Sequence, residues 1–303
     1  MQSKRSSLIG IGWFVLSLLV SSVNDILAKY LSSNLPTLEI SFFRFFFGTL
    51  SLLPIIGFYG ISSIKTRRFS IHFIRGFLLV IAISLWTYGL RYSQVTTATI
   101  ISFTIPMFIL IMAPLFLKEY VSKSLWMATI LGMIGILITL NPKDVQFNAM
   151  SMMFIIAAMI FASLDIINKK YSIKESLLSM IFYSSLVTSL VGVIPLYFQW
   201  VKPNGPDILC LILLGICSNL ILFCLLKSFR LINASRVAPF RYLELIISII
   251  LAYLIFGDIP TQNMYLGSAL IIPCALYVES YKEKGCKNKY ILIWPNYIFI
   301  TRL

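Results

Sequence analysis

The chain has 303 residues, of which 59% are hydrophobic and 12% are charged, and its mean hydropathy is +0.91. A soluble domain carries roughly 25% charged residues, so this composition excludes a globule coated with polar side chains and predicts a membrane protein. The formal net charge is +14, which raises nucleic acid as a partner until the positions of the basic residues are considered.

Ten hydrophobic stretches are long enough to cross a bilayer, for which about 20 apolar residues suffice. In chain order they cover approximately residues 8–29, 38–58, 73–90, 95–116, 124–141, 150–168, 178–199, 207–226, 235–256 and 263–281. The first stretch is expected to be a span and not a signal peptide, because no small-residue cleavage site follows it and Asp25 and Lys29 lie at its far end. The remaining connections are too short to hold a soluble domain.

Lysine and arginine are distributed unevenly over these connections. With the N-terminus placed in the cytoplasm, 19 of the 25 basic residues fall on the cytoplasmic side and four on the other, while Arg44 and Arg241 lie within spans. This distribution follows the positive-inside rule, so we assign the basic charge to topology and expect no nucleic acid partner. Both termini are expected in the cytoplasm.

The chain also repeats itself at an offset of about 140 residues. The string DILAKY at 25–30 resembles DIINKKY at 165–171, and Phe42 and Phe43 align with Phe182 and Tyr183. Each half has five spans, an odd number, so the second half enters the membrane from the opposite side. The sequence predicts an all-α integral membrane protein of ten transmembrane helices in two inverted five-helix repeats, residues 1–147 and 148–282. A C-terminal tail of uncertain structure, 283–303, follows; chance similarity between apolar sequences is the alternative to the repeat.

Charged side chains inside the spans are the first candidates for a binding site, because each costs roughly 2.5–3.5 kcal/mol at the centre of a span. In chain order they are Asp25, Arg44, Asp165, Arg241 and Glu244. Asp25 and Asp165 each precede a lysine by four residues, and Arg241 precedes Glu244 by three, so structural pairs on one helix face are also expected. Substrate binding and structural pairing both remain open.

Aromatic side chains and prolines complete this set. An aromatic face near a charge can hold a cation or stack on a base, which makes substrate-binding candidates of Trp86, Tyr88, Tyr183 and Tyr242. Pro106 and Pro239 lie in the fourth and ninth spans. There they are expected to break the helix, to free backbone carbonyls that line a cavity, and to take part in gating.

The sequence contains no nucleophile elbow, no P-loop and no paired metal motif. His72 is its one histidine, and the five cysteines include no CxxC pair. We therefore expect no catalytic residue, no metal and no cofactor. The chain is predicted not to be an enzyme, and transport driven by a gradient or by exchange remains.

Eight strings together resemble the S-adenosylmethionine uptake transporters, in the EamA branch of the drug/metabolite transporter superfamily. They are GIGWF (10–14), SSVNDILAKYL (21–31), FFRFFF (42–47), WTYGL (86–90), VTTATIISFTIP (95–106), LDIINKKY (164–171), KESLLSMIFYSSLVT (174–188) and APFRYLELIIS (238–248). The resemblance covers about residues 8–282 in order. It implies ten spans in two inverted halves, surrounding membrane lipid, a bacterial inner membrane and S-adenosylmethionine as substrate, and it assigns no binding residue.

The candidate residues suit this substrate, which carries a sulfonium, an ammonium, a carboxylate and an adenine. Asp25, Asp165 and Glu244 are expected to balance the two cations, Tyr183 or Tyr242 to face the adenine or the sulfonium, and Arg44 or Arg241 to bind the carboxylate. The same set suits other cargo, so a transporter or exporter of another amino-acid-like or nucleoside metabolite is the alternative. Exchange for S-adenosylhomocysteine, ion coupling and a homodimer all stay open.

Overall fold

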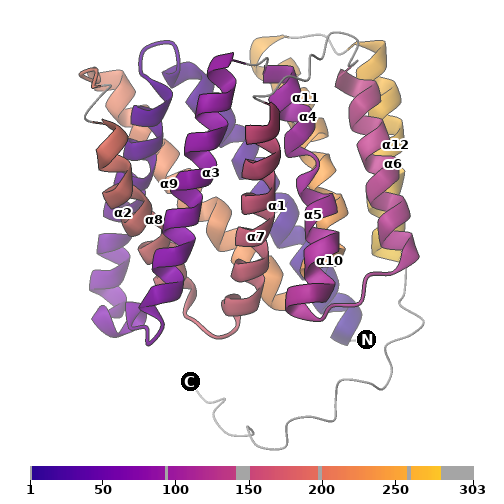
Figure 1. Ribbon diagram of the computed structural model, residues 1–303, viewed down its shortest axis with the longest axis horizontal. Helices are drawn as coiled ribbons and strands as arrows, with labels where there is room; N and C mark the ends of the chain where they lie inside the picture. The colour runs from indigo at the N-terminus through magenta and orange to yellow at the C-terminus, as the bar shows by residue number, and fades with distance from the viewer. Residues whose placement is uncertain (1, 93–94, 141–150, 197–199, 258–260, 281–303) are drawn as a thin grey trace, which may run out of the picture.

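The computed structural model describes residues 2–92, 95–140, 151–196, 200–257 and 261–280, and within these ranges every regular element is a helix. The helices run side by side along one direction (Figure 1). They are α1 (Gln2–Leu31), α2 (Thr37–Tyr59), η1 (Ile61–Ile64), α3 (Phe69–Tyr92), α4 (Val95–Ser102), α5 (Ile105–Met112), η2 (Ala113–Leu117), α6 (Lys123–Leu140), α7 (Ser151–Ser172), α8 (Leu177–Leu196), α9 (Gly205–Leu231), α10 (Ala234–Val237), η4 (Ala238–Tyr242), α11 (Leu243–Phe256) and α12 (Gln262–Ser280).

These helices coincide with the predicted spans. In the part of the chain that the structure describes, nine helical stretches are long and apolar enough to cross a membrane. The 19-residue helix α12 occupies the tenth predicted position. The prediction of an all-α, multi-pass membrane protein is therefore confirmed at this level. The predicted tail at 283–303 and the predicted division between 147 and 148 fall outside the described residues.

The fourth and ninth spans are not continuous helices. The fourth is divided into α4 and α5, with Pro106 in the first turn of α5, where its missing N–H leaves no hydrogen bond unmade. The ninth begins as the short helix α10, passes through the 3₁₀ turn η4 that contains Pro239, and continues as α11. Both prolines thus lie at interruptions of their spans.

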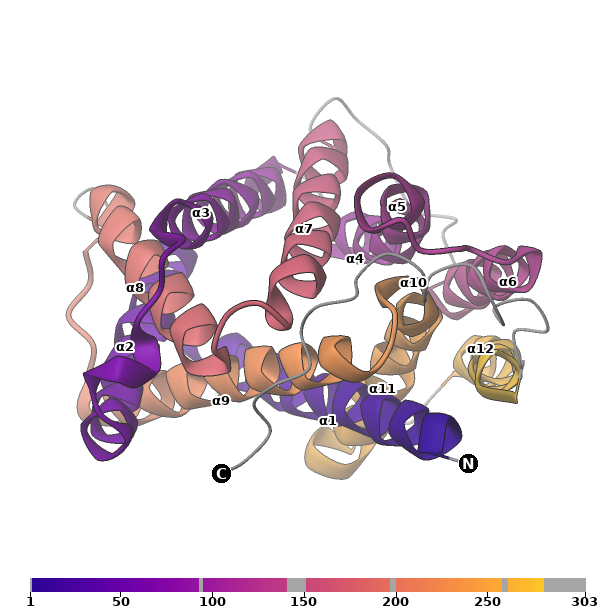
Figure 2. The same ribbon diagram turned by 90° about the horizontal axis from the view of Figure 1, so that it is seen from below.

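The most extensive helix contacts join the first half of the chain to the second. The most extensive contacts pair α1 with α9 and α11, α2 with α8 and α9, α3 with α7 and α8, α5 with α7, and α6 with α12. Each pair joins one of the first five spans to one of the last five. Seen along the helices, α6 and α12 lie together at one edge of the bundle (Figure 2).

Glycines permit the closest of these contacts. A Cβ on Gly215 of α9 would lie 2.6 Å from the backbone nitrogen of Gly48 on α2. Between α6 and α12, a Cβ on Gly135 would lie 3.0 Å from the carbonyl oxygen of Gly267. Helices in lipid gain no hydrophobic driving force from one another, so small residues that let backbones approach supply much of the packing.

Candidate functional site

A cavity of about 670 Å³ lies inside the bundle, within the range of roughly 300–1,000 Å³ that small-molecule sites occupy. Helices from both halves form its wall: α1 to α5 from the first, and α7, α8, α9, η4 and α11 from the second. Six of the lining side chains are charged, and they comprise the acids Asp25, Asp165 and Glu244 and the bases Arg44, Arg75 and Arg241. The five charges singled out in the sequence therefore face one shared cavity.

Asp165 and Arg241 form an ion pair between two helices of the second half. Nη2 of Arg241 on η4 lies 2.9 Å from Oδ2 of Asp165 on α7, and their side chains are 19% and 9% exposed. The helix-face partners expected from the spacing are not the ones found. Lys169 instead donates to the backbone carbonyls of Phe229 and Ile232.

The remaining acids lie where α1 meets α11. Asp25 is exposed to the cavity, is attracted by Arg44 and is repelled by Glu244. Nε of Arg44 donates to Oγ of Ser218 on α9. Glu244 belongs to neither of the two ion pairs among the described residues. This side of the cavity thus presents negative charge that the protein neutralises only in part.

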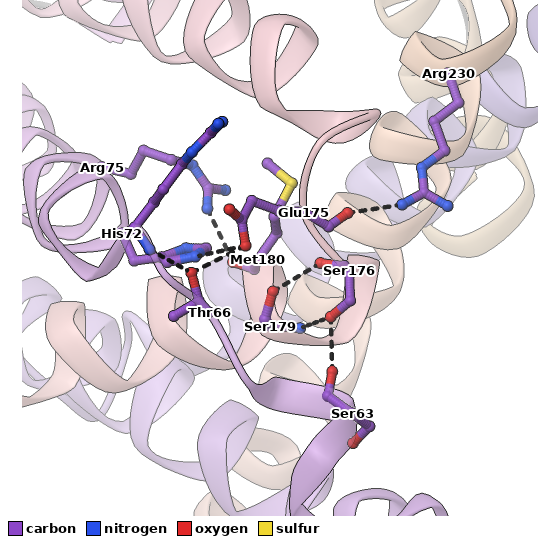
Figure 3. A network of polar contacts seen from close by, with 10 residues as sticks. Ser63, Thr66, His72, Arg75, Glu175, Ser176, Ser179, Met180 and Arg230 are labelled. Carbon is purple, nitrogen blue, oxygen red and sulfur yellow. Dashed lines mark hydrogen bonds and ion pairs between the residues drawn. The ribbon is translucent and has the colours of Figure 1, made fainter. Parts of the chain in front are cut away.

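Arg75 is the functional candidate that the sequence reasoning missed. Nε of Arg75 donates to Oδ1 of Asn168 at 2.8 Å. Nη1 of Arg75 donates to the carbonyl oxygen of Met180 at 3.1 Å (Figure 3). The third span was expected to start at about residue 73, and Arg75, only two residues beyond that start, was counted among the cytoplasmic basic residues. Because α3 begins at Phe69, Arg75 lies almost two turns inside the helix. The apolar stretch Phe69–Gly89 was the signal that pointed to it.

Of the four aromatic candidates, Trp86 lines the cavity. Its ring lies 6.4 Å from that of Phe161, and Phe161 and Phe103 also line the wall. These two phenylalanines were not singled out in the sequence, where nothing distinguishes them from other apolar residues of their spans. Together the three rings form an aromatic part of the wall.

The three tyrosine candidates lie away from the cavity wall. Tyr88 is 47% exposed and packs on Tyr92. The ring of Tyr183 lies 5.1 Å from that of His72. Tyr242 is 1% exposed and packs its ring where a side chain on Gly132 would stand. Pro106 and Pro239 do not line the cavity either, but Ile105 and Arg241, next to or near them, do.

Polar contacts join the two halves at both ends of the bundle. At one end, which we call the Glu175 end, Oγ1 of Thr66 donates to Oε2 of Glu175 at 2.9 Å and Oγ of Ser176 donates to the carbonyl of Ser63 (Figure 3). Nε2 of His72 also lies 3.7 Å from Oε2 of Glu175.

At the opposite end, which we call the Glu39 end, Oε2 of Glu39 accepts a hydrogen bond from the backbone N–H of Val201 at 2.9 Å. Nδ2 of Asn34 donates to Oδ1 of Asp207 at 3.1 Å. The first and the second half are therefore in contact at both ends of the bundle. Among the described side chains, no group of three or more histidines, cysteines and acids is placed to hold a metal ion.

Comparison with known proteins identifies the family to which the chain belongs. Residues 8–141 and 148–278 match the EamA-like transporter family. The chain is 46% identical to the S-adenosylmethionine uptake transporter of Rickettsia conorii over 94% of this chain and 97% of that one. It is 47% identical to the protein of the same name from Rickettsia bellii, over 93% and 97%. A crystal structure with 16% sequence identity superposes with a TM-score of 0.77 over 90% of this chain and 96% of the other, which shows the fold alone.

Proposed function

The chain belongs to the EamA-like transporter family, and we propose that it takes up S-adenosylmethionine across the bacterial inner membrane by alternating access. The observation that carries this proposal is the cavity, whose wall combines acids, arginines and aromatic rings. The choice of S-adenosylmethionine as the substrate follows the names of the two Rickettsia relatives. This family and these relatives indicate that the chain is a transporter and not an enzyme.

The wall of the cavity suits the groups of this substrate. Glu244 and Asp25 attract the sulfonium and the ammonium, since neither acid belongs to an ion pair in the described part of the chain. Trp86 and Phe161 offer ring faces and edges to the adenine, which is the chemistry by which aromatic side chains hold bases. Because Asp165 is already paired with Arg241, it contributes less to binding a cation.

The helix contacts support two inverted repeats, 1–147 and 148–282. Exchanging each span with its counterpart five spans later converts the pair α1 and α9 into α7 and α3, and the pair α1 and α11 into α7 and α5. All four pairs are among the extensive contacts. Two halves related in this way can rock about a central site, so that the contacts at the Glu175 end and the Glu39 end open in turn.

The distribution of basic residues supports the orientation. Without Arg75, which lies in the cavity wall, 18 basic residues are expected on one side and four on the other, and by the positive-inside rule this distribution favours a cytoplasmic location for both termini. The Glu175 end, which lies on the same side as the N-terminus, then faces the cytoplasm, and the Glu39 end faces the periplasm.

Uptake of radiolabelled S-adenosylmethionine into bacterial cells that express the chain tests the proposal. We expect saturable uptake that unlabelled S-adenosylhomocysteine inhibits and leucine does not. Vesicles loaded with S-adenosylhomocysteine then distinguish exchange, which accelerates uptake, from coupling to an ion gradient. Absence of saturable uptake from cells that contain the inserted protein would refute this function. In that case, efflux of a panel of amino acids and nucleosides tests the alternative, transport of another metabolite.

A further inference from the structure

The three arginines of the cavity differ in how far the protein neutralises them. Arg241 is paired with Asp165 at 2.9 Å. Arg44 lies in the attractive field of Asp25. Arg75 has no acid within ion-pair distance among the residues that the structure describes. It is thus the arginine of the cavity wall that carries the least compensated positive charge.

The hydrogen bonds of Arg75 orient its guanidinium and use only some of its N–H donors. Asn168 and the carbonyl of Met180 each accept one bond, at 2.8 Å and 3.1 Å. A guanidinium has five N–H donors in a fixed planar arrangement. Both acceptors are neutral, so they hold the group in place without cancelling its charge. Arg75 is 1% exposed, and it is held at the border of the cavity, with Asn168 beside it in the wall.

We propose that Arg75, held by Asn168 and by the backbone of α8, binds the carboxylate of the transported amino acid and so determines specificity for substrates that carry one. This inference rests on the proposed function and deepens it. A guanidinium binds a carboxylate through two parallel, charge-assisted hydrogen bonds, which is the strong and directional form of this contact. The carboxylate of the substrate then forms the ion pair with Arg75 that no acid of the described residues provides, while Glu244 and Asp25 attract the ammonium and the sulfonium.

The alternative for Arg75 is a structural role, in which it only ties α3 to α7 and α8. The two roles differ for a substrate analogue that lacks the carboxylate. Decarboxylated S-adenosylmethionine keeps the adenine, the sulfonium and the ammonium, and it has hydrogen in place of the carboxylate. Loss of a carboxylate anchor weakens binding of the natural substrate alone, whereas loss of a structural tie affects both compounds.

The test is the initial rate of uptake of each labelled compound by the purified full chain in liposomes. For Arg75→Gln we expect the KM for S-adenosylmethionine to rise roughly 10- to 100-fold, the value of charge-assisted hydrogen bonds to one carboxylate. The KM for the decarboxylated analogue should change by less than about threefold. Arg230→Gln is the matched control, because Arg230 also donates to backbone carbonyls, those of Ser172 and Glu175, and does not line the cavity.

Asn168→Asp provides a second variant that keeps the shape of the site and the residue Arg75. The new carboxylate takes the place of the amide oxygen that already accepts from Nε of Arg75, and it competes with the carboxylate of the substrate. We expect the same selective rise in KM for S-adenosylmethionine. This variant decides the question if Arg75→Gln does not insert into the membrane.

The outcomes separate the two proposals. If the wild-type chain takes up neither compound, the proposed function fails. If the wild type takes up S-adenosylmethionine but Asn168→Asp and any inserted Arg75→Gln change both KM values in equal proportion, the function stands and the role of Arg75 is overturned. A selective loss for the compound with the carboxylate supports both.

Discussion

The ion pair between Asp165 and Arg241 gives a quantitative prediction about stability. Replacing one partner, by Asp165→Asn or by Arg241→Gln, leaves the other charge enclosed in the bundle without its counter-ion. The two side chains retain only 9% and 19% exposure, and the atoms are 2.9 Å apart. Removing one partner of a buried pair costs about 3–5 kcal/mol. We expect about 3 kcal/mol for each single variant, at the lower limit, because the pair borders a cavity.

The double variant Asp165→Asn with Arg241→Gln distinguishes this explanation from simple loss of packing. It removes the pair and leaves no uncompensated charge. We therefore expect it to be more stable than either single variant by about 1–2 kcal/mol. Such recovery follows only if the cost of the single variants comes from the partner that is left behind.

The assay is reversible unfolding of the purified chain in detergent micelles, with free energies compared across the four members of the cycle. Lys170→Gln is the matched control, since Lys170 is an exposed residue of the same helix as Asp165, and we expect it to stay within about 0.5 kcal/mol of the wild type. If the double variant is destabilised by the full sum of the single variants, the ion-pair reasoning is wrong.

Three further predictions concern binding, packing and the alternation of access. Glu244→Gln should lower the rate of S-adenosylmethionine uptake at least tenfold at low substrate concentration without changing the amount of inserted protein, because it removes about 1.5–3 kcal/mol of attraction for a cation; unchanged uptake would contradict its assignment. Gly215→Ala should destabilise the chain or prevent its accumulation in membranes, because the new Cβ would lie 2.6 Å from the backbone of α2. Gly57→Ala is the control on α2, and it should be neutral because a Cβ at this position has no atom within 4 Å. Equal behaviour of the two variants would refute the packing argument. Thr66→Val removes a hydrogen bond between the halves. In a background without native cysteines, we expect it to raise the rate at which Ser184→Cys, in the cavity wall, reacts with an impermeant thiol reagent added from the cytoplasmic side. A lower rate would contradict a gate at that end.

The sequence predicted the elements of this fold well because two properties of the spans are local. Length and apolarity mark a segment that crosses a bilayer, and they required no knowledge of its neighbours. Charges inside such segments are costly unless they face a cavity or a partner. For this reason Asp25, Arg44 and Glu244, which lie on three different helices, were all candidates before any contact was known, and all three line the same cavity.

The choice of partners was not predictable in the same way, because it depends on how helices are rotated and placed. Arg241 and Tyr242 are adjacent in sequence, yet one faces the cavity and the other packs where the absent side chain of Gly132 leaves room. Helix spacing placed Glu244 three residues from Arg241, but Asp165, on another helix, forms the ion pair. Such contacts are tertiary, and the periodicity of one helix does not contain them.

The high cost of charge in a membrane accounts for the equal numbers of acids and arginines in the cavity wall. A group of like charges enclosed in a membrane is strongly disfavoured, so a site for a substrate with both signs of charge has to be nearly neutral as a whole. Pairing every acid with an arginine would satisfy that condition and leave nothing to bind. This chain pairs Asp165 with Arg241 and keeps Glu244 and Arg75 apart from any ion pair among its described residues. Asp25 and Arg44 lie outside those ion pairs as well, so acids and arginines both remain available to the opposite charges of an amino-acid substrate.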